Sequence, residues 1–451
     1  MVESIGILPG LPPVCGKPVH LAFDGGRLTS DAGIVLLAQI ERRLGIAERL
    51  ARCIEDPRDP AAVKHSIAEM IRFRALLIAA GYPDGNDCDA LRADPAFKLA
   101  VGRLPSSGAE LCSQPTISRL ENLPGPIALK RMMAAMVELF CDSFAQVPAS
   151  IVLDIDDTED AAHGGQQLAL FNAHYDSRCF LPIHIYEATS GKPVAIFLRP
   201  GKTPDGVEVA RVLRHVIGAI RARWPRVAIL VRGDSHYGRI EAMTWCDRNR
   251  VRYIFGLAGN KALLRKVAGL AEDAALARVA GEAEKVRRHG EVDYAAGSWP
   301  GRQDGAARRV VARVEAGPQG TDTRFIVTNL AGTPEHLYQT VYCARGRAEN
   351  LIKAHKLHLA SDRTSCSTAT ANQFRLLLHT AAYWLMHTLR GLAPKSSFWR
   401  DAQFDTIRSS LIKLAARVTE MATRIKIALP SAYPYQHSWA LLAARTTRLP
   451  P

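Results

Sequence analysis

The chain has 451 residues, 47% of them hydrophobic, and its 58 Lys and Arg against 44 Asp and Glu give a formal net charge of +14. This length and composition indicate a globular protein with a large buried core in two or three domains. The basic excess is spread along the chain and favours a polyanionic partner, nucleic acid first. Nine cysteines stand singly with no CxxC pair, which argues against a disulfide framework and a zinc ribbon. No secretory segment or membrane-spanning run is apparent, so we expect a cytoplasmic protein with no membrane partner.

Residues 1–148 are predicted to be mostly helical. Stretches such as SDAGIVLLAQIERRLGI place apolar residues three and four positions apart, and turn-rich joints such as YPDGNDCD separate them. Arg119, Lys130 and Arg131 suit either a solvated helix face or a face that contacts DNA.

A different pattern begins in residues 149–259. Three extended runs come first, and the second and third, FLPIHIYEATS and KPVAIFLRPG, are joined at Gly191 like a hairpin. A helix, a buried strand ending in VRGD, a second helix and a further strand follow. The predicted order is therefore three strands, helix, strand, helix, strand.

Residues 260–340 are predicted to be a β-rich insertion. Segments such as RRVVARVEA and TRFIVTNL have the composition of antiparallel strands joined by open turns. Helical periodicity returns in residues 341–451, beginning with ARGRAENLIKAHKLHL. The chain as a whole is predicted to have an α/β fold.

Carboxylates stand at distinctive places in this pattern. Asp154 and Asp156 lie two positions apart on the first strand and so share a face, whereas Asp234 ends the fourth strand and Glu349 falls on the helix after the insertion. The first and fourth strands of an open mixed sheet can be neighbours, and ligands collect at strand ends. Converging carboxylates repel one another unless a cation lies between them. Hard divalent cations take such oxygens, and two of them about 3.5–4 Å apart can support an in-line phosphoryl displacement.

Basic residues surround Glu349 on its helix. If Glu349 faces the metals, residues on neighbouring turns can hold the phosphates of DNA. These are Arg345, Arg347, Lys353 and Lys356.

Simpler interpretations of the acids remain open. Glu349 could be a salt-bridge partner of its basic neighbours, Asp234 a helix cap, and residues 157–160 a plain acidic loop. His236 suits either a role near a phosphate or a hydrogen bond within a turn. The other histidines near the first acid match no familiar zinc pattern.

The spacing of Tyr342, Arg345, Glu349 and Lys356 resembles Y-x2-R-x3-E-x6-K, the signature of the IS4-like DDE transposases. DIDDTED, RGDSHYG, RGRAEN and a terminal RIKIALPSAYPYQ resemble the IS1380 group of bacterial insertion-sequence transposases. The resemblance covers nearly the whole chain. It implies an RNase H-like mixed-sheet catalytic core with a β-rich insertion, preceded by a helical N-terminal domain. It also implies cut-and-paste DNA transposition with two Mg²⁺ or Mn²⁺ ions.

The resemblance assigns roles to individual residues. The family's D-x-T pattern fits Asp156, with Asp154 as the alternative, and Asp234 and Glu349 complete the catalytic and metal-binding set. It gives phosphate contacts to Tyr342, Arg345 and Lys356. Many members have a Trp directly after the signature Arg, where this chain has Gly346. The role of this Trp, stacking near a distorted DNA end, is absent here or supplied elsewhere, for instance by Trp299. Trp299 could equally be a core residue of the insertion.

We therefore expect a transposase that recognises the terminal inverted repeats of its own element, cleaves there and joins the ends to target DNA. Residues 1–148 would bind the ends, residues 149–259 and 341–451 would form the core, and residues 260–340 would be the insertion. A homodimer would bring two ends together, on DNA in the bacterial cytoplasm and nucleoid. The rival expectations are an RNase H-like nuclease without strand transfer and an inactive, transposase-derived DNA-binding regulator.

Overall fold

The computed structural model describes residues 12–21, 23–296 and 307–448. The chain folds into two compact units. The first comprises Met1–Ala128, Leu357–Ser361 and Leu378–Pro451, and the second comprises Leu129–Lys356 and Asp362–Leu377.

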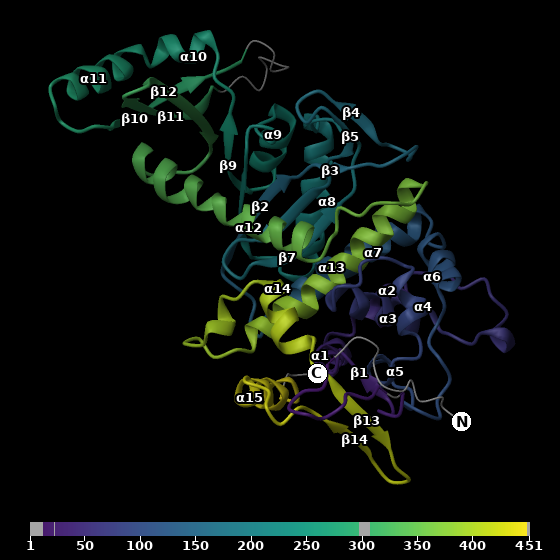
Figure 1. The fold of residues 1–451 in the computed structure, drawn as a ribbon. Helices are drawn as coiled ribbons and strands as arrows, with labels where there is room; N and C mark the ends of the chain where they lie inside the picture. Colours follow the sequence, from purple (N-terminus) through teal and green to yellow (C-terminus); the bar gives the residue numbers. More distant parts are fainter. Residues whose placement is uncertain (1–11, 22, 297–306, 449–451) are drawn as a thin grey trace. The chain divides into compact units, whose positions relative to one another are not determined.

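An eight-stranded mixed sheet forms the centre of the second unit (Figure 1). The strands lie in the order β10-β11-β12-β9-β8-β2-β6-β7. Their bounds are β2 (Ser150–Asp157), β6 (Ile183–Glu187), β7 (Lys192–Phe197), β8 (Ala228–Gly233), β9 (Arg252–Leu257), β10 (Val286–Tyr294), β11 (Arg308–Gly317) and β12 (Gly320–Thr328).

Five of these strands have the topology of an RNase H-like core. Strands β7, β6 and β2 pair antiparallel, and β2, β8 and β9 pair parallel. The parallel pairs need crossover connections, which α8 (Gly206–Arg223) and α9 (Ile240–Arg248) supply. The predicted order of strands and helices is confirmed, including the β6–β7 hairpin, in which Gly191 adopts a φ of +70°. The predicted fold class is confirmed as well.

The insertion differs from the prediction at its start. Two helices, α10 (Lys261–Lys266) and α11 (Ala268–Val279), precede the three expected antiparallel strands. Strand β12 pairs with β9, so the insertion extends the central sheet. Helix α11 was missed because its buried contact with this sheet uses mainly small side chains, such as Ala274, and leaves Val279 exposed. Trp299 lies outside the described residues.

A small sheet that the sequence did not predict lies between β2 and β6 in the chain. Its strand order is β3-β5-β4. The bounds are β3 (Asp160–Ala161), β4 (Leu170–Asn172) and β5 (Ser177–Phe180).

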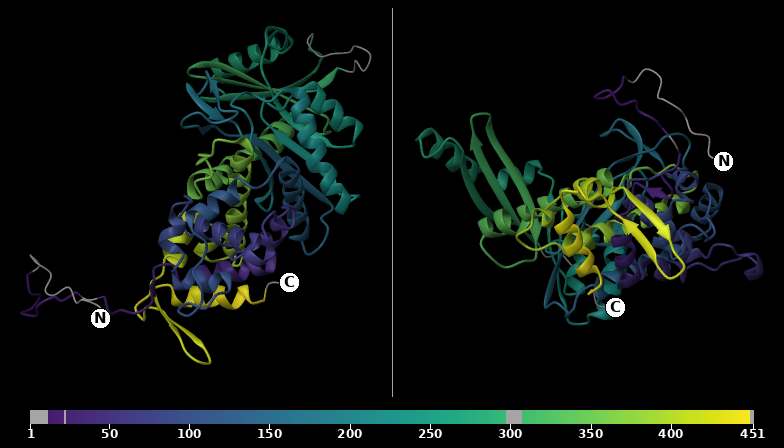
Figure 2. Two further views of the ribbon diagram at one scale, coloured as in Figure 1. Left: turned by 90° about the vertical axis from the view of Figure 1, so that its right-hand side faces the viewer. Right: turned by 60° about the horizontal axis from the view of Figure 1, so that its bottom comes forward.

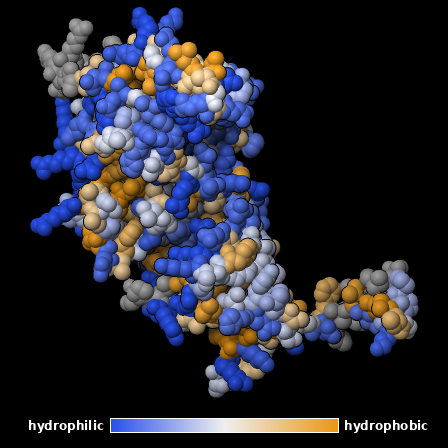
Figure 3. Space-filling view, turned by 90° about the vertical axis from the view of Figure 1, so that its left-hand side faces the viewer, coloured by the Kyte–Doolittle hydropathy of each residue, from blue (hydrophilic) through white to orange (hydrophobic). Residues whose placement is uncertain are grey.

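The N-terminal part of the chain is helical, as predicted. Its helices are α1 (Ile34–Leu44), α2 (Ile46–Ala51), α3 (Ile67–Ala79), α4 (Asp87–Leu91), α5 (Pro95–Val101), α6 (Gln114–Glu121) and α7 (Pro126–Asp142). The C-terminal part adds α12 (Arg347–Lys353), α13 (Ala369–Gly391), α14 (Phe404–Ile407) and α15 (Gln436–Thr446). None of the helices among the described residues is both long and apolar enough to cross a membrane. Hydrophilic residues cover most of the face drawn in Figure 3, and hydrophobic residues appear on it in scattered groups.

A second three-stranded sheet belongs to the first unit. Its order is β1-β13-β14, with β1 (Leu28–Thr29), β13 (Ala416–Glu420) and β14 (Ile425–Ala428). The first unit thus groups the C-terminal residues with the N-terminal helices, although the sequence placed residues 341–451 with the core. The four functional segments expected from the sequence remain a prediction.

Candidate active site

The parallel pairing of β2 and β8 brings two predicted acids to one edge of the sheet. The register pairs Asp154 with Arg232 and Ile155 with Gly233. Asp156 and Asp234 are the next residues after this last pair, Asp156 still on β2 and Asp234 at the start of the turn after β8. The negative charge of Asp234 contributes to a raised pKa of Asp156, which agrees with their proximity.

Asp154 forms a buried ion pair. Asp154 is 1% exposed. Its two carboxylate oxygens accept hydrogen bonds from Nε and Nη2 of Arg232 at 2.6 and 2.8 Å. Arg232 also donates from Nη1 to the carbonyl oxygen of Val341 at 2.9 Å. Asp154 is therefore held as a structural link, and this geometry favours Asp156 as the first acid of the site.

Asp156 lies beside a guanidinium group. Arg345 Nη1 donates to Asp156 Oδ2 at 2.8 Å, and both side chains are largely shielded from solvent. Burial raises the pKa of Asp156 to about 7, against the lowering effect of Arg345 and with a further rise from Asp234. The two acids are thus held together at an electrostatic cost.

Asp234 begins the turn that follows β8. Its Oδ1 accepts a hydrogen bond from the backbone N–H of His236 at 2.8 Å. The helix-cap interpretation is wrong, because α9 begins only at Ile240 and has no side-chain cap. The bond within the turn is compatible with a site role, since it fixes the carboxylate of Asp234 in place.

The segment that carries Glu349 is helical, but its hydrogen-bonding pattern changes along its length. A π-helical stretch (His336–Tyr342) leads through a 3₁₀ turn (Cys343–Gly346) into α12, and a second π-helical stretch (Ala354–His358) follows. The sequence predicted one regular helix with basic residues on the turns next to Glu349, but α-helical spacing does not apply along the whole of this segment.

Glu349 is exposed on α12 and has no ion-pair partner among the described residues. The salt-bridge interpretation of this acid therefore finds no support. Burial works against the charge of Arg345, but its pKa is raised by Asp156, Tyr342, Asp234 and Glu349. Arg345 thus links all three predicted acids electrostatically.

The other predicted DNA-binding residues have different surroundings. Lys356 Nζ donates to the carbonyl oxygen of Glu159 and lies 3.5 Å from its Oε2, so Lys356 holds the loop after β2. Arg347 and Lys353 are exposed. The guanidinium of Arg345 lies 5.9 Å from the centre of the Tyr342 ring.

Gly256 on β9 allows a close approach that the sequence did not reveal. A Cβ atom at this position would lie 2.8 Å from both the Ser235 nitrogen and the Tyr342 hydroxyl, and 3.0 Å from the Asp234 carbonyl carbon. Only glycine leaves room for Tyr342 and the turn of Asp234 to pack there.

A second group that was missed steadies the same turn. Asp157 Oδ2 accepts a hydrogen bond from the Tyr237 hydroxyl at 3.1 Å and lies 3.1 Å from His236 Nδ1. The hydrogen bond to Asp157 raises the pKa of His236. Asp157 is therefore not part of a plain acidic loop. The sequence signal for its role was its position directly after Asp156 in DIDD.

The residues fit a divalent cation by their donor chemistry. Asp156, Asp234 and Glu349 offer the hard carboxylate oxygens that Mg²⁺ and Mn²⁺ prefer. Burial, with smaller contributions from Asp234 and Asp157, raises the pKa of Asp156, and a nearby cation would stabilise its charged form. In the described part of the chain, no three His, Cys, Asp or Glu side chains are arranged to hold a metal, and Arg345 supplies the positive charge beside Asp156.

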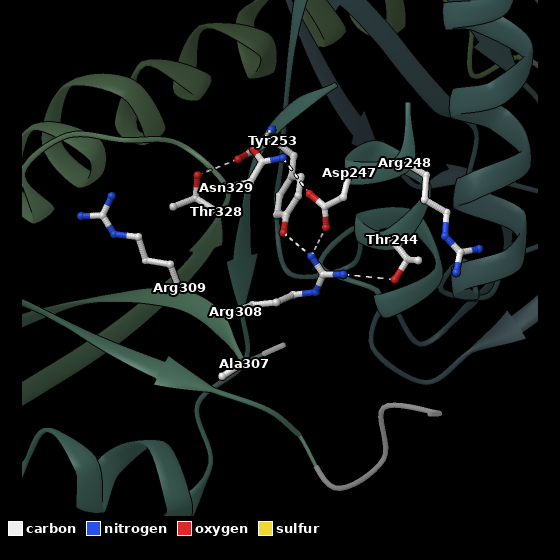
Figure 4. A pocket seen from close by; sticks show the side chains of 9 residues that line it. All are labelled: Thr244, Asp247, Arg248, Tyr253, Ala307, Arg308, Arg309, Thr328 and Asn329. Carbon is white, nitrogen blue, oxygen red and sulfur yellow. Dashed lines mark hydrogen bonds and ion pairs between the residues drawn. The ribbon is translucent and has the colours of Figure 1, made fainter. Parts of the chain in front are cut away.

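A separate hollow of about 440 Å³ lies between α9, β9, β11 and β12 (Figure 4). None of the predicted site residues lines it. Arg308 donates to the Tyr253 hydroxyl at 2.7 Å and to Thr244 Oγ1 at 3.1 Å, and it also pairs with Asp247. These contacts join the insertion to α9.

An RNase H-like sheet with acids at the ends of its two central parallel strands defines a class of enzymes that cut and join nucleic acids. The chain belongs to the family described as Transposase DDE domain group 1, whose model matches residues 11–451. The resemblance to DDE transposases is thereby confirmed.

Among solved structures, the chain is similar to the piggyBac transposase in a cryo-EM structure of its synaptic complex with hairpin DNA. The TM-score is 0.43 at 9% sequence identity, over 86% of this chain and 81% of that chain. No curated protein sequence matches the chain.

Proposed function

We propose that this protein is the transposase of a bacterial insertion sequence of the IS1380 group, within the IS4-like transposases. It would act as a homodimer on the DNA of the bacterial nucleoid, cleave at the terminal inverted repeats and transfer the freed ends into target DNA. The observation that carries the proposal is the β2–β8 register, whose last pair directly precedes Asp156 and Asp234, together with the bond from Arg345 to Asp156. The family match supports transposition as the general activity.

Asp156, Asp234 and Glu349 would hold the divalent cations, two Mg²⁺ or Mn²⁺ ions. When bound, such ions activate the attacking water or hydroxyl and stabilise the leaving oxygen. The carboxylates bind the ions and are not themselves nucleophiles.

The basic residues of the same segment would hold the DNA. Arg347 and Lys353 are exposed on α12, on either side of Glu349, and can contact the phosphates next to the scissile bond. Arg345 and Tyr342 would position the strand at the acids. Lys356 would act through Glu159, by fixing the loop that follows Asp156.

Cleavage of a labelled duplex that carries the terminal repeat tests this proposal. With Mg²⁺, the wild-type protein should cut at the repeat boundary, whereas Asp234→Asn and Glu349→Gln should bind the duplex and fail to cut it. Glu272→Gln is the matched control, because Glu272 is an exposed acid on α11. Normal cutting by the Asp234 and Glu349 variants would contradict the site assignment.

A supercoiled target plasmid in the same reaction separates transposition from simple nuclease action. Joined products should appear with the wild-type protein. Cut ends without joined products would indicate a nuclease, and binding without any cutting would indicate a regulator.

A further inference from the structure

Strands β13 and β14 form a two-stranded ribbon in the first unit. Four residue pairs join them, from Arg417 with Ala428 to Glu420 with Ile425, and the Met421 N–H donates to the Arg424 carbonyl oxygen at 2.9 Å to close the turn. The short strand β1 pairs only with the base of β13. Figure 2 shows the turn extending away from the helices of its own unit. The ribbon lies in the stretch containing RIKIALPSAYPYQ, which has no place in the proposed catalytic site.

One face of this ribbon packs against its own unit. Val418 is 2% exposed and pairs with Ile427, which packs against a buried cluster at the base of the ribbon. Glu420 lies on the same face as Val418, and its carboxylate accepts hydrogen bonds from the backbone N–H groups of Ser106 and Ser107 at 2.8 and 3.1 Å. The ribbon is therefore held in a fixed orientation.

The opposite face carries exposed cations. Successive side chains of a strand point to opposite faces, so Arg417, next to Val418, and Lys426, next to Ile427, lie on this face. Arg424 is exposed at the turn. None of these three side chains has an ion-pair partner among the described residues. Arg424 Nε contacts only the Met421 sulfur, at 3.4 Å, in the described structure.

The arginines on the described strands of the insertion, by contrast, are paired with acids. On β10 and β11, Arg287 lies 2.6 Å from Glu315, and Arg313 lies 2.7 Å from Asp322. The cationic face of the ribbon has no such acids, since Glu420 points to the other side. Unneutralised cations on a fixed, projecting surface favour a polyanion, and each one that meets a phosphate releases condensed counterions.

We propose that the β13–β14 ribbon binds duplex DNA, with its cationic face in the major groove and Arg417, Arg424 and Lys426 on the phosphates and base edges. The major groove admits a two-stranded β-ribbon. Met421, which is 41% exposed at the turn, can contact thymine methyl groups there. The inference rests on the proposed function only in taking DNA as the partner, and it places DNA binding in a C-terminal element as well as in the N-terminal helices.

The salt dependence of DNA binding tests this inference. The full-length protein is titrated against a fluorescent terminal-repeat duplex over a series of salt concentrations, with Arg417→Gln/Arg424→Gln/Lys426→Gln beside the wild type. Each phosphate contact contributes about 0.9 to the slope of log K against log salt, so loss of three contacts should reduce the slope by up to about 2.7. Unchanged circular dichroism and thermal midpoint would show that the variant is folded.

A control variant separates the ribbon from net charge. Lys285→Gln/Arg287→Gln/Arg324→Gln removes the same charge from exposed positions of the insertion. A clearly larger loss of slope in the ribbon variant supports the inference. An unchanged slope, or equal losses in both variants, would overturn it. A change in oligomeric state with unchanged DNA affinity would also overturn it and make the ribbon a protein interface.

This result is independent of the catalytic proposal. If the wild-type protein fails to cut terminal repeats but the ribbon variant still shows the larger loss of slope, the proposed function fails and the ribbon assignment stands.

Discussion

Replacement of Asp154 by Ala should destabilise the second unit without acting on catalysis itself. The change leaves Arg232, with a side chain only 7% exposed, without its carboxylate partner. Removing one partner of a buried ion pair typically costs about 3–5 kcal/mol, because the remaining charge stays buried and uncompensated. Of the Arg232 bonds described above, only the one to the Val341 carbonyl oxygen would then remain.

Thermal unfolding measures this cost. A change of 1 kcal/mol shifts the midpoint of a domain of 150–250 residues by about 2–4 °C, so Asp154→Ala should lower the midpoint by about 10 °C. Asp156→Ala should show no comparable loss, because burial already disfavours the charge of Asp156. It should nevertheless abolish cleavage of the terminal-repeat duplex.

A double replacement distinguishes a structural pair from a catalytic acid. Asp154→Leu/Arg232→Met removes both charges and fills their space with apolar side chains. Such a replacement of a buried ion pair is often neutral or favourable for stability. This variant should recover most of the midpoint and retain measurable cleavage. If the double variant is fully folded and fails to cut, or if Asp154→Ala is as stable as the wild type, the assignment of Asp154 to a structural role is wrong.

Further outcomes follow from the same edge of the sheet. In EDTA, stability should fall by up to about 4 kcal/mol as pH rises from about 4 to about 7, because folded Asp156, with a pKa of about 7 against the ordinary 3.8, keeps a proton that the unfolded chain has released. The thermal midpoint of Asp156→Asn should not show this fall with pH. Equal pH profiles of the midpoint for Asp156→Asn and the wild-type protein would contradict the prediction. Gly256→Ala should cost about 1–3 kcal/mol and slow cleavage at least 10-fold by displacing the Asp234 turn, which chemical denaturation and single-turnover cleavage would measure. Glu159→Gln should reproduce part of the cleavage defect of Lys356→Met, whereas an unaffected Glu159 variant would indicate that Lys356 contacts DNA directly.

The order of the core could be predicted because each strand is a short apolar run bounded by turn residues. The neighbouring positions of Asp156 and Asp234 followed from that order, since parallel strands end at the same edge. The preference for Asp156 over Asp154 came from the family's D-x-T pattern, but the sequence also held a structural argument for it that was not used. Arg232 precedes Asp234 by two positions, as Asp154 precedes Asp156, so two paired strands place the first two residues opposite each other.

Other parts of the structure depend on contacts that have no local pattern. Helix α11 presents small residues to the sheet, so its periodicity is weak. The ribbon of β13 and β14 depends on pairing between strands of only five and four residues, within a region that is otherwise mostly helical. The glycine requirement at position 256 depends on Tyr342, which is far away in the sequence and comes close only in the folded chain.

The spacing of the signature residues is explained by what each one touches at the edge of the sheet. Tyr342 packs at Gly256 beside the turn of Asp234, Arg345 reaches Asp156, and Lys356 reaches Glu159. These contacts lie along a segment that passes from π to 3₁₀ to α and back to π, so no regular helical face would align all three. The spacing of the signature therefore reflects contacts with the ends of β2, β8 and β9. Its acid, Glu349, makes none of these contacts and is exposed to solvent, where DNA would lie.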